Sequence, residues 1–309
     1  MKTGLIIQGP LISRGRTGKT ARISFHDIKE SDVVNYNCVS DIIATFDRHR
    51  EVFGHMVCVT WDTEAPDVIK MLSENLQEGE LVLISDKTAP IEKKGSIISG
   101  NNKNRQFFSV KEGIKVLKEK GCDAVIKGRT DQLLEYEALK VKLEQGLEEG
   151  ESKLYIPWFN VTSEKSVNAI PDFYIGGSLV DMEHFCNEML NEEPMFESVH
   201  YDIFYKWCLS RSKFKPLLIR YFSRVGVKGN WLFTFLFVER KLKREFSAFP
   251  TFVLTDLKWR GERFVSNDVY IDSFQFTRIP RLNAIDSLLL VIKTVSRKAT
   301  KFLTRTDDV

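Results

Sequence analysis

The chain has 309 residues, of which 43% are apolar and 28% are charged, with 18 Gly and 9 Pro. This composition excludes a disordered, collagen-like or low-complexity chain and allows one large domain or two modest ones. The longest apolar stretches, residues 231–238 and 287–292, are much shorter than the roughly 18 to 20 residues that cross a bilayer, so we expect no membrane span. A short apolar stretch at residues 5–7 is broken at once by Gln8-Gly9-Pro10, and we therefore expect no secretory signal and a cytoplasmic protein.

The five cysteines and five histidines show no metal-binding spacing. The sequence contains no C-x-x-C pair, which disfavours a zinc ribbon, a thioredoxin-type motif and a disulfide framework. It contains no H-x-x-x-H or H-E-x-x-H either. We expect buried thiols, and oxygen ligands for any metal.

The net charge of +3 hides an uneven distribution. Residues 1–210 carry 25 Lys and Arg against 33 Asp and Glu, whereas residues 211–309 carry 20 against 9. A basic end of this kind suits an anionic membrane surface or a nucleic acid, and a solvated basic face is the plainer alternative. Because residues 1–210 contain no nucleic-acid-binding module, we expect no nucleic-acid partner.

The first 135 residues alternate between predicted strands and helices. Short apolar runs rich in β-branched residues predict buried parallel strands at 4–7, 56–59, 81–84 and 124–126. Apolar residues at helical spacing predict helices at 33–49, 65–76 and 103–120. Farther on, we expect a strand at 153–160, a strand or turn at 172–179, and helices at 182–190 and 201–210. The order predicts an α/β fold with helices on both faces of the sheet.

Polar residues follow each of these four strands, at the sheet edge where ligands bind in open α/β sheets. They are Gln8-Gly9-Pro10, Thr60-Trp61-Asp62, Ser85-Asp86-Lys87 and Lys127-Gly128-Arg129-Thr130-Asp131. The sequence therefore predicts a polar crevice at this edge.

Gly18-Lys19-Thr20 resembles the end of a phosphate-binding P-loop but lacks its first glycine. The motif G-x-x-x-x-G-K-[ST] requires Gly at position 13, where this chain has Ser. A basic loop that closes over a phosphate-bearing ligand and a simple surface loop are the alternatives.

Two further segments suit charged ligands. An acid at a strand end, with bases beside it, can hold Mg²⁺ or Mn²⁺ together with substrate phosphates, so Asp131 is a candidate metal ligand. The alternative is a structural ion pair between Arg129 and Asp131. Asn104 and Arg105 open a predicted helix, whose free N–H groups suit an anion, although ordinary N-capping explains the asparagine as well.

Taken together, these motifs give residues 4–135 a resemblance to the WavE-type family of lipopolysaccharide-synthesis glycosyltransferases. The resemblance is carried by Ile6-Ile7-Gln8-Gly9-Pro10, Val59-Thr60-Trp61, Ser85-Asp86, Asn104-Arg105-Gln106 and Lys127-Gly128-Arg129-Thr130-Asp131. It implies a GT-A-like (Rossmann-like) nucleotide-sugar-binding sheet with helices on both faces. It also implies that Arg129-Thr130-Asp131 stands where related enzymes have a D-x-D metal motif, although position 129 is basic here. From their placement at strand ends or near the start of the adjoining helix, the predicted donor-binding residues are Gln8, Gly9, Pro10, Asp62, Asp86, Asn104, Arg105, Lys127 and Arg129.

Candidate bases for the acceptor lie in the second half. Residues 171–178 are similar to the acceptor-side segment of such enzymes and include Asp172; a plain strand and turn is the alternative. His200 and Asp202 begin a predicted helix and are candidate general bases or helix-capping residues.

The C-terminal end contains a predicted amphipathic helix. Apolar residues recur at helical spacing over residues 285–302 with Lys and Arg around them, and residues 230–237 are rich in aromatics. Such segments can lie on an anionic membrane surface, or they can pack against the rest of the protein.

We therefore predict a peripheral membrane glycosyltransferase on the inner face of the membrane. It would transfer a sugar from a nucleotide-sugar donor to a glycan or lipid-linked acceptor, with Asp131 in a catalytic or metal-binding role (Mn or Mg) that supports activity more than stability. The predicted regions are a catalytic domain at 1–210, divided into a donor half (1–135) and an acceptor half (136–210), and a basic C-terminal region at 211–309. A kinase or nucleotidyltransferase with a degenerate phosphate loop and a non-catalytic membrane adaptor are the alternatives.

Overall fold

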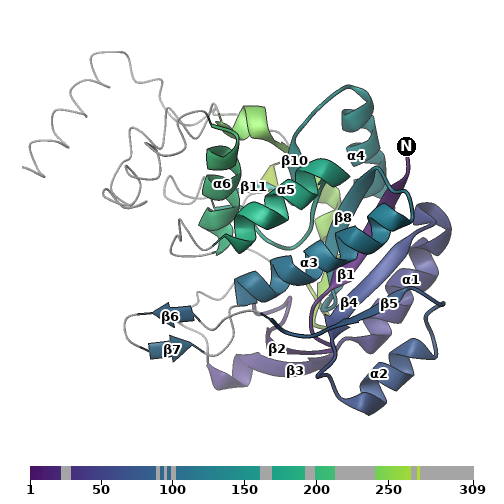
Figure 1. Cartoon of the computed structure of the whole chain (residues 1–309). Coiled ribbons are helices and arrows are strands. Elements are labelled where there is room, and N and C mark those ends of the chain that lie inside the picture. The colour runs from purple at the N-terminus through teal and green to yellow at the C-terminus, as the bar shows by residue number, and fades with distance from the viewer. Residues whose placement is uncertain are drawn as a thin grey trace, which may run out of the picture.

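The computed structural model describes residues 1–21, 29–87, 91–93, 96–98, 102–160, 169–191, 199–212, 241–265 and 270–271. Within them, seven strands form the central sheet in the order β13-β10-β12-β8-β1-β4-β5 (Figure 1). Their bounds are β1 Thr3–Gln8, β4 Met56–Trp61, β5 Leu81–Ile84, β8 Ala124–Arg129, β10 Leu154–Ile156, β12 Ile175–Ser178 and β13 Phe246–Ala248. Strand β12 runs antiparallel to both neighbours, and the other pairs are parallel.

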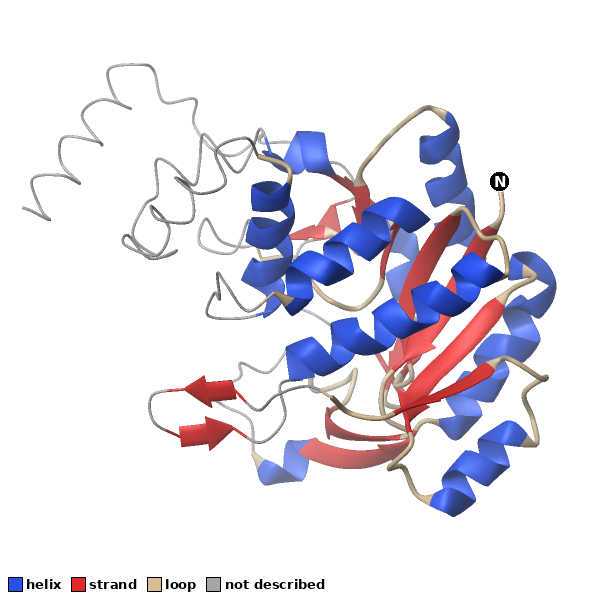
Figure 2. Cartoon of the chain, viewed as in Figure 1, coloured by secondary structure: helices blue, strands red, loops and turns tan. Residues whose placement is uncertain are grey.

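Helices cover both faces of this sheet, which confirms the predicted α/β class (Figure 2). On one face lie α3 (Asn102–Glu119), α5 (Leu179–Leu190) and α6 (Val199–Ser210); on the other lie α1 (Val39–Phe53) and α4 (Glu137–Glu148), with α2 (Pro66–Ser73) beside α1. Side chains of a strand alternate between faces, so Ile6 packs under α3 while Leu5 and Ile7 pack under α1. This double burial explains the continuous apolar runs in the sequence.

The predicted helix at residues 33–49 is only partly correct. Residues 33–37 form strand β3 (Val33–Asn37), which pairs antiparallel with β2 (Ile12–Arg16), and helix α1 begins at Val39. The pattern misled because Val34 and Cys38 stand four residues apart, a spacing that a short strand followed by a helix also produces. The polar hairpin β2–β3 continues from the carboxyl end of β1, and the short 3-10 helix η2 (Glu30–Asp32) lies in its connection, directly before β3.

Residues of the predicted C-terminal region belong to the same core. Strand β13 pairs with β10 in the central sheet, and β14 (Lys258–Trp259) joins β9 (Gln132–Leu133) and β15 (Glu262–Arg263) in a small sheet. The 3-10 helix η4 (Thr251–Thr255) lies between β13 and β14 along the chain. The central sheet therefore includes residues from both sides of position 210, and the predicted division into regions stays a prediction.

Two smaller pairs complete the described strands. Strand β11 (Phe159–Asn160) pairs with β16 (Tyr270–Ile271), and β6 (Ile91–Lys93) pairs with β7 (Ser96–Ile98). No helix within the described ranges is both long and apolar enough to cross a membrane. The predicted amphipathic helix at 285–302 and the aromatic stretch at 230–237 lie outside the described residues.

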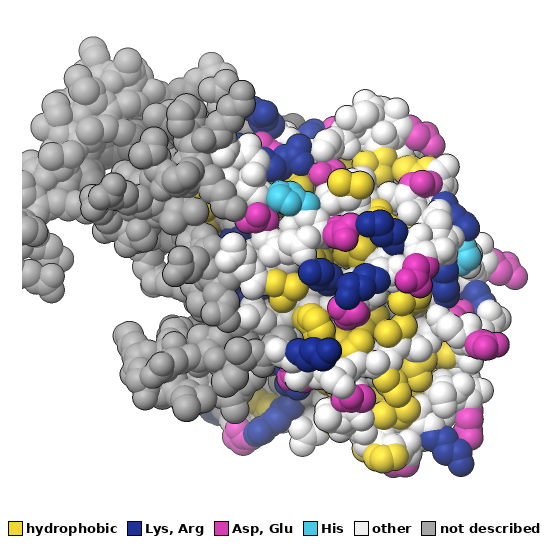
Figure 3. Space-filling model, viewed as in Figure 1, with side chains coloured by type: hydrophobic (Ala, Val, Ile, Leu, Met, Phe, Trp, Pro, Cys, Tyr) yellow, Lys and Arg dark blue, Asp and Glu magenta, His cyan; other side chains and the backbone are white. Residues whose placement is uncertain are grey.

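The face that carries α3 has charged side chains of both signs spread among apolar ones (Figure 3). Apolar side chains are visible near the edge strand β5 and α2, where Leu83 is 43% and Met71 is 50% exposed. The polar residues that follow the strands gather instead at the carboxyl edge of the sheet.

Candidate functional site

A cavity of about 590 Å³ lies where strands β1 and β8 end. Its wall also takes residues from the loop after β4, the start of α3, the hairpin β2–β3 and the β14–β15 turn. Among the described residues, the charged side chains of this wall are Arg14, Glu64, Lys103, Arg105, Arg129, Asp131, Asp172 and Arg260. The lining thus has five cationic side chains and three carboxylates, and Glu30, Asp86 and Asp202 pair with three of the cations from outside the lining.

The ends of β1 and β8 are joined through Gly9 and Thr130. The φ of Gly9 is +137°, and a Cβ at this position would lie 2.7 Å from Thr130 Oγ1, so only glycine fits. The Thr130 hydroxyl donates to the Pro10 carbonyl at 2.7 Å, and its backbone N–H donates to the Gln8 carbonyl at 3.1 Å. The Gln-Gly-Pro motif therefore sets the chain path next to Asp131.

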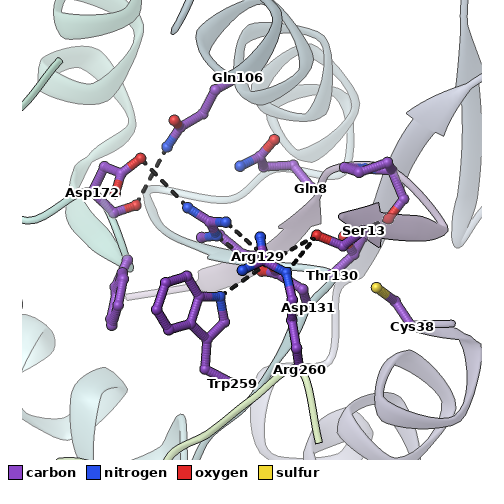
Figure 4. Close-up of polar contacts among 12 residues, drawn as sticks. Gln8, Ser13, Cys38, Gln106, Arg129, Thr130, Asp131, Asp172, Trp259 and Arg260 are labelled. Carbon is purple, nitrogen blue, oxygen red and sulfur yellow. Dashed lines mark hydrogen bonds and ion pairs between the residues drawn. The ribbon is translucent and has the colours of Figure 1, made fainter. Parts of the chain in front are cut away.

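Asp131 lies at the floor of the cavity and is only 2% exposed. Arg129 donates to both of its oxygens, with Nε to Oδ1 at 2.9 Å and Nη2 to Oδ2 at 3.0 Å (Figure 4). Oδ2 also accepts from Ser13 Oγ at 3.0 Å and from Trp259 Nε1 at 3.2 Å, and it pairs with Arg260 Nη2 at 2.9 Å. The predicted ion pair of Arg129 and Asp131 is thus present, extended by residues from both ends of the chain.

Arg260 reaches Asp131 from the turn between β14 and β15. Its Nε donates to Ser13 Oγ at 3.0 Å, its Nη1 donates to the Arg16 carbonyl, and its guanidinium lies 4.8 Å from the centre of the Trp259 ring. The guanidinium also packs against Gly15, where a Cβ would come within 2.7 Å of Nη1. This side chain fastens the hairpin β2–β3 to the C-terminal segment.

Asp172 is the second buried carboxylate of the wall. It faces Arg129 Nη1 and His200 Nε2, each at 3.5 Å. With the amide of Gln106 turned to satisfy both neighbours, its nitrogen donates to Asp172 Oδ2 at 2.9 Å and its oxygen accepts from Lys127 Nζ at 2.7 Å. Lys127 is fully buried and also donates to the backbone carbonyl of Asp172. Arg129 therefore bridges the two carboxylates.

Burial and neighbouring positive charges shift the pKa of these two carboxylates in opposite directions. Burial alone would raise the pKa of Asp131, but the guanidiniums of Arg129 and Arg260 lower it to about 2. Burial would likewise raise the pKa of Asp172, yet His200, Arg129 and Lys127 hold it well below its usual range. Both carboxylates are ionised at neutral pH. Burial lowers the pKa of Lys127 to about 7.

Arg105 forms the opposite wall, at the start of α3. Its Nε lies 2.7 Å from Asp86 Oδ2, and its guanidinium lies over the Trp61 ring, 4.9 Å from the centre. Lys103, two residues earlier, donates to the buried Asp202 at 2.7 Å. Glu64 also lines the cavity. Burial raises its pKa, while hydrogen bonds from the backbone of Leu11 and Ile12 and the charge of Arg105 oppose the change.

The structure brings most of the predicted site residues to this edge of the sheet. The cavity is lined by Gln8, Gly9, Pro10, Arg105, Arg129, Asp131 and Asp172. Lys127, Asp86 and Asp202 lie outside the lining, each bonded to one of these residues or to Lys103. His200, which is 46% exposed, faces Asp172. Asp62 accepts from Ser85 and does not line the cavity, and the buried Asn104 does not line it either. Their predicted functions stay predictions.

Sequence patterns did not single out Ser13, Arg14, Glu64, Lys103, Trp259 and Arg260 as site residues. Lys103 and Glu64 stand beside motifs that the sequence did single out, so their neighbourhood was a usable signal. Trp259 and Arg260 follow no motif, and 128 residues separate Trp259 from Asp131. Only the pairing of β14 with β9 places them there.

The donor set around Asp131 does not suit a divalent metal. Mg²⁺ and Mn²⁺ need carboxylate oxygens at about 2.0–2.2 Å and open positions for water and phosphate. Both oxygens of Asp131 already accept from cationic groups, and two guanidiniums would repel a second cation. The described residues contain no group of three or more His, Cys, Asp or Glu that could hold an ion. Metal binding at Asp131 stays a prediction, which these contacts disfavour.

Gly18-Lys19-Thr20 lies in a turn that packs on the β14–β15 hairpin. The Gly18 N–H donates to the Trp259 carbonyl at 2.8 Å, and its carbonyl accepts from Val265 N–H at 3.0 Å. A Cβ at Gly18 would come within 2.2 Å of the Glu262 carbonyl oxygen. The glycine thus permits close packing, and Lys19 points to solvent as an exposed side chain.

No family model and no curated protein matches the chain. Among solved structures it is similar to a cytidylyltransferase from Leptospira borgpetersenii serovar Hardjo-bovis, with 13% identity and a TM-score of 0.40 over 96% of both chains. It is also similar to 4-diphosphocytidyl-2C-methyl-D-erythritol synthase from Anaerococcus prevotii, with 14% identity and a TM-score of 0.36 over 64% of this chain and 78% of that one. These likenesses are distant in sequence and in TM-score, so the chemistry of the cavity must identify the function.

Proposed function

We propose that the protein is a transferase that binds a nucleotide-sugar diphosphate in this cavity and transfers the sugar to a glycan or lipid-linked acceptor, as the WavE-type resemblance implies. The observation that carries the proposal is the cavity itself. It lies at the carboxyl ends of parallel strands, and its wall has five cationic side chains against three carboxylates. A diphosphate carries the negative charge that such a wall attracts.

Positioned positive charge would also supply the main catalytic effect. When the sugar leaves, negative charge develops on the diphosphate, and cations already in place stabilise it without reorganisation. Arg105 is one-third exposed and stacked on Trp61. It can therefore contact the ligand without breaking the buried hydrogen bonds around Asp131. Arg129 is fixed by Asp131 and Asp172 and does not need to move.

Among the predicted bases, His200 suits the acceptor side best. Asp202 is 1% exposed and paired with Lys103, and Asp172 is held ionised with a depressed pKa, so neither is a good proton acceptor. His200 is 46% exposed, and its Nε2 faces Asp172. Asp172 would orient the ring, which leaves Nδ1 to take the proton of an acceptor hydroxyl.

A thermal-shift screen with UDP-, GDP- and CMP-sugars tests the proposal. A ligand that binds only the folded state raises the melting temperature, by an amount set by its concentration and Kd. We expect a shift with at least one sugar nucleotide in the wild type and a smaller shift in Arg105→Gln. Arg263→Gln is the matched control, because Arg263 is exposed and does not line the cavity.

Three results would contradict the proposal. If none of the sugar nucleotides raises the melting temperature, the protein has no donor site. If the shifts in Arg105→Gln and the wild type are equal, the sugar nucleotide does not bind at Arg105. Consumption of a nucleoside triphosphate with release of pyrophosphate would identify a nucleotidyltransferase instead.

A further inference from the structure

Two guanidiniums meet on one carboxylate oxygen at the floor of the cavity. Arg129 Nη2 and Arg260 Nη2 lie 3.0 Å and 2.9 Å from the same Oδ2 of Asp131. Asp131 compensates only one of these charges, and Asp172, the other acidic partner of Arg129, compensates the second at 3.5 Å on the far side. The two charges are therefore balanced by two carboxylates, and what the pair offers to a ligand is a compact, fixed group of guanidinium N–H donors.

Both guanidiniums keep hydrogen-bond donors for a ligand. A guanidinium has five N–H groups. Arg129 uses three of them on Asp131 and Asp172, and Arg260 uses three on Asp131, Ser13 and the Arg16 carbonyl. Within the described part of the chain, two donors on each side chain have no partner, and both side chains line the cavity.

The backbone conformation at Arg260 indicates that its side chain has a function. Arg260 and Gly261 form the two-residue turn between β14 and β15, with φ of +50° and +77°. A turn with two positive φ values favours Asn, Asp or Gly, and Arg260 is the only non-glycine residue with positive φ in the described ranges. An arginine in an unfavourable turn position, aimed into a cavity, indicates a role for its side chain.

We propose that Arg129 and Arg260 together bind the diphosphate of the donor and take the place of a divalent metal ion. The inference rests on the proposed function, because it names the group that the cavity recognises. Asp131 then acts as a positioning residue that holds the two guanidiniums together, and Ser13 and Trp259 hold Asp131. Donor binding is accordingly independent of added metal.

Calorimetric titration of the full chain tests this inference, with inorganic pyrophosphate, UDP and GDP as probes. One series contains EDTA and the other contains Mn²⁺. We expect pyrophosphate and at least one nucleotide to bind in EDTA, with a Kd that Mn²⁺ changes by less than about threefold.

The variant Arg260→Asn removes the guanidinium but suits the positive φ of the turn. We expect its Kd for pyrophosphate to rise about tenfold to hundredfold, because charge-assisted hydrogen bonds are lost. Arg263→Asn, an exposed arginine of the same hairpin, should bind as the wild type does. Arg260→Lys, which keeps the charge without the planar fork, should fall between them.

Each outcome decides between explanations. Binding that requires Mn²⁺ overturns the inference and leaves the proposed function standing. Equal affinity in Arg260→Asn and the wild type shows that Arg260 only fastens the hairpin, which also overturns it. If no probe binds the folded wild type under either condition, the proposed function itself fails. The wild-type series in EDTA decides the metal question even if a variant does not fold.

Discussion

Replacing Asp131 by Asn tests how the floor of the cavity is held together. The substitution keeps the side-chain volume and removes one negative charge. Two guanidiniums and an indole N–H then remain in a nearly water-free position, facing a neutral amide. Removing one partner of a buried ion pair typically destabilises a protein by about 3–5 kcal/mol, because the remaining charge has lost its compensation.

The pKa of Asp131 gives a second measure of the same effect. Its fall from the ordinary 3.8 to about 2 corresponds to about 2 kcal/mol of stability at neutral pH, since one pKa unit equals about 1.36 kcal/mol. Asn can still accept hydrogen bonds through its amide oxygen, so we expect a loss of about 3 kcal/mol. A loss of this size lowers the melting temperature by about 5 °C, because the unfolding entropy is about 2.1 cal/mol/K per residue in a chain of 309 residues.

Urea unfolding of the wild type and of Asp131→Asn measures this difference. A depressed carboxyl pKa stabilises the fold above the unfolded pKa, and the contribution disappears as pH falls through the folded value. The two proteins should therefore differ by a constant amount between pH 5 and 8, and the difference should shrink between about pH 4 and 2. The control is Asp256→Asn, since Asp256 is exposed beside the same hairpin. Equal stability of wild type and Asp131→Asn at pH 7 would refute the reasoning.

Other predictions concern proton transfer, burial and membrane binding. His200→Ala should lower transfer by about 10²-fold to 10⁴-fold in a radiolabelled sugar assay with little change in melting temperature, and unchanged transfer would contradict its role as base. Burial lowers the pKa of Lys127 to about 7, so above that pH the unfolded chain binds more protons than the folded one. The free energy of unfolding of the wild type, relative to that of Lys127→Met, should therefore rise from pH 7 to about 10. A difference that does not change with pH would contradict the lowered pKa. Deletion of residues 284–309 should release the protein from anionic vesicles in a sedimentation assay and leave donor binding intact, and loss of donor binding would show that this segment belongs to the core.

The motif at Asp131 allowed two interpretations, a metal or donor ligand whose loss affects activity more than stability, and a structural ion pair with Arg129. The ion pair and the burial of Asp131 are present in the structure, and the role as a ligand stays a prediction. A motif gives the residue types at a strand end but not the partners that arrive from elsewhere in the chain. Arg260 supplies such a partner from 129 positions away, and with it a structural role that local sequence does not encode.

Local sequence determined the elements and the place of the site. Gly4 to Ile7 and Ala124 to Ile126 are apolar on both faces, a pattern that only a covered sheet satisfies, and parallel strands bring Gln8 and Arg129 to one edge side by side. The hairpin β2–β3, the β14–β15 turn and the enclosure of Asp131 were decided by tertiary structure alone. The hydrogen bonds that enclose Asp131 join pairs among Ser13, Asp131, Trp259 and Arg260 that lie more than a hundred positions apart. Such contacts depend on which strands meet in three dimensions, a property that no local pattern of residues contains.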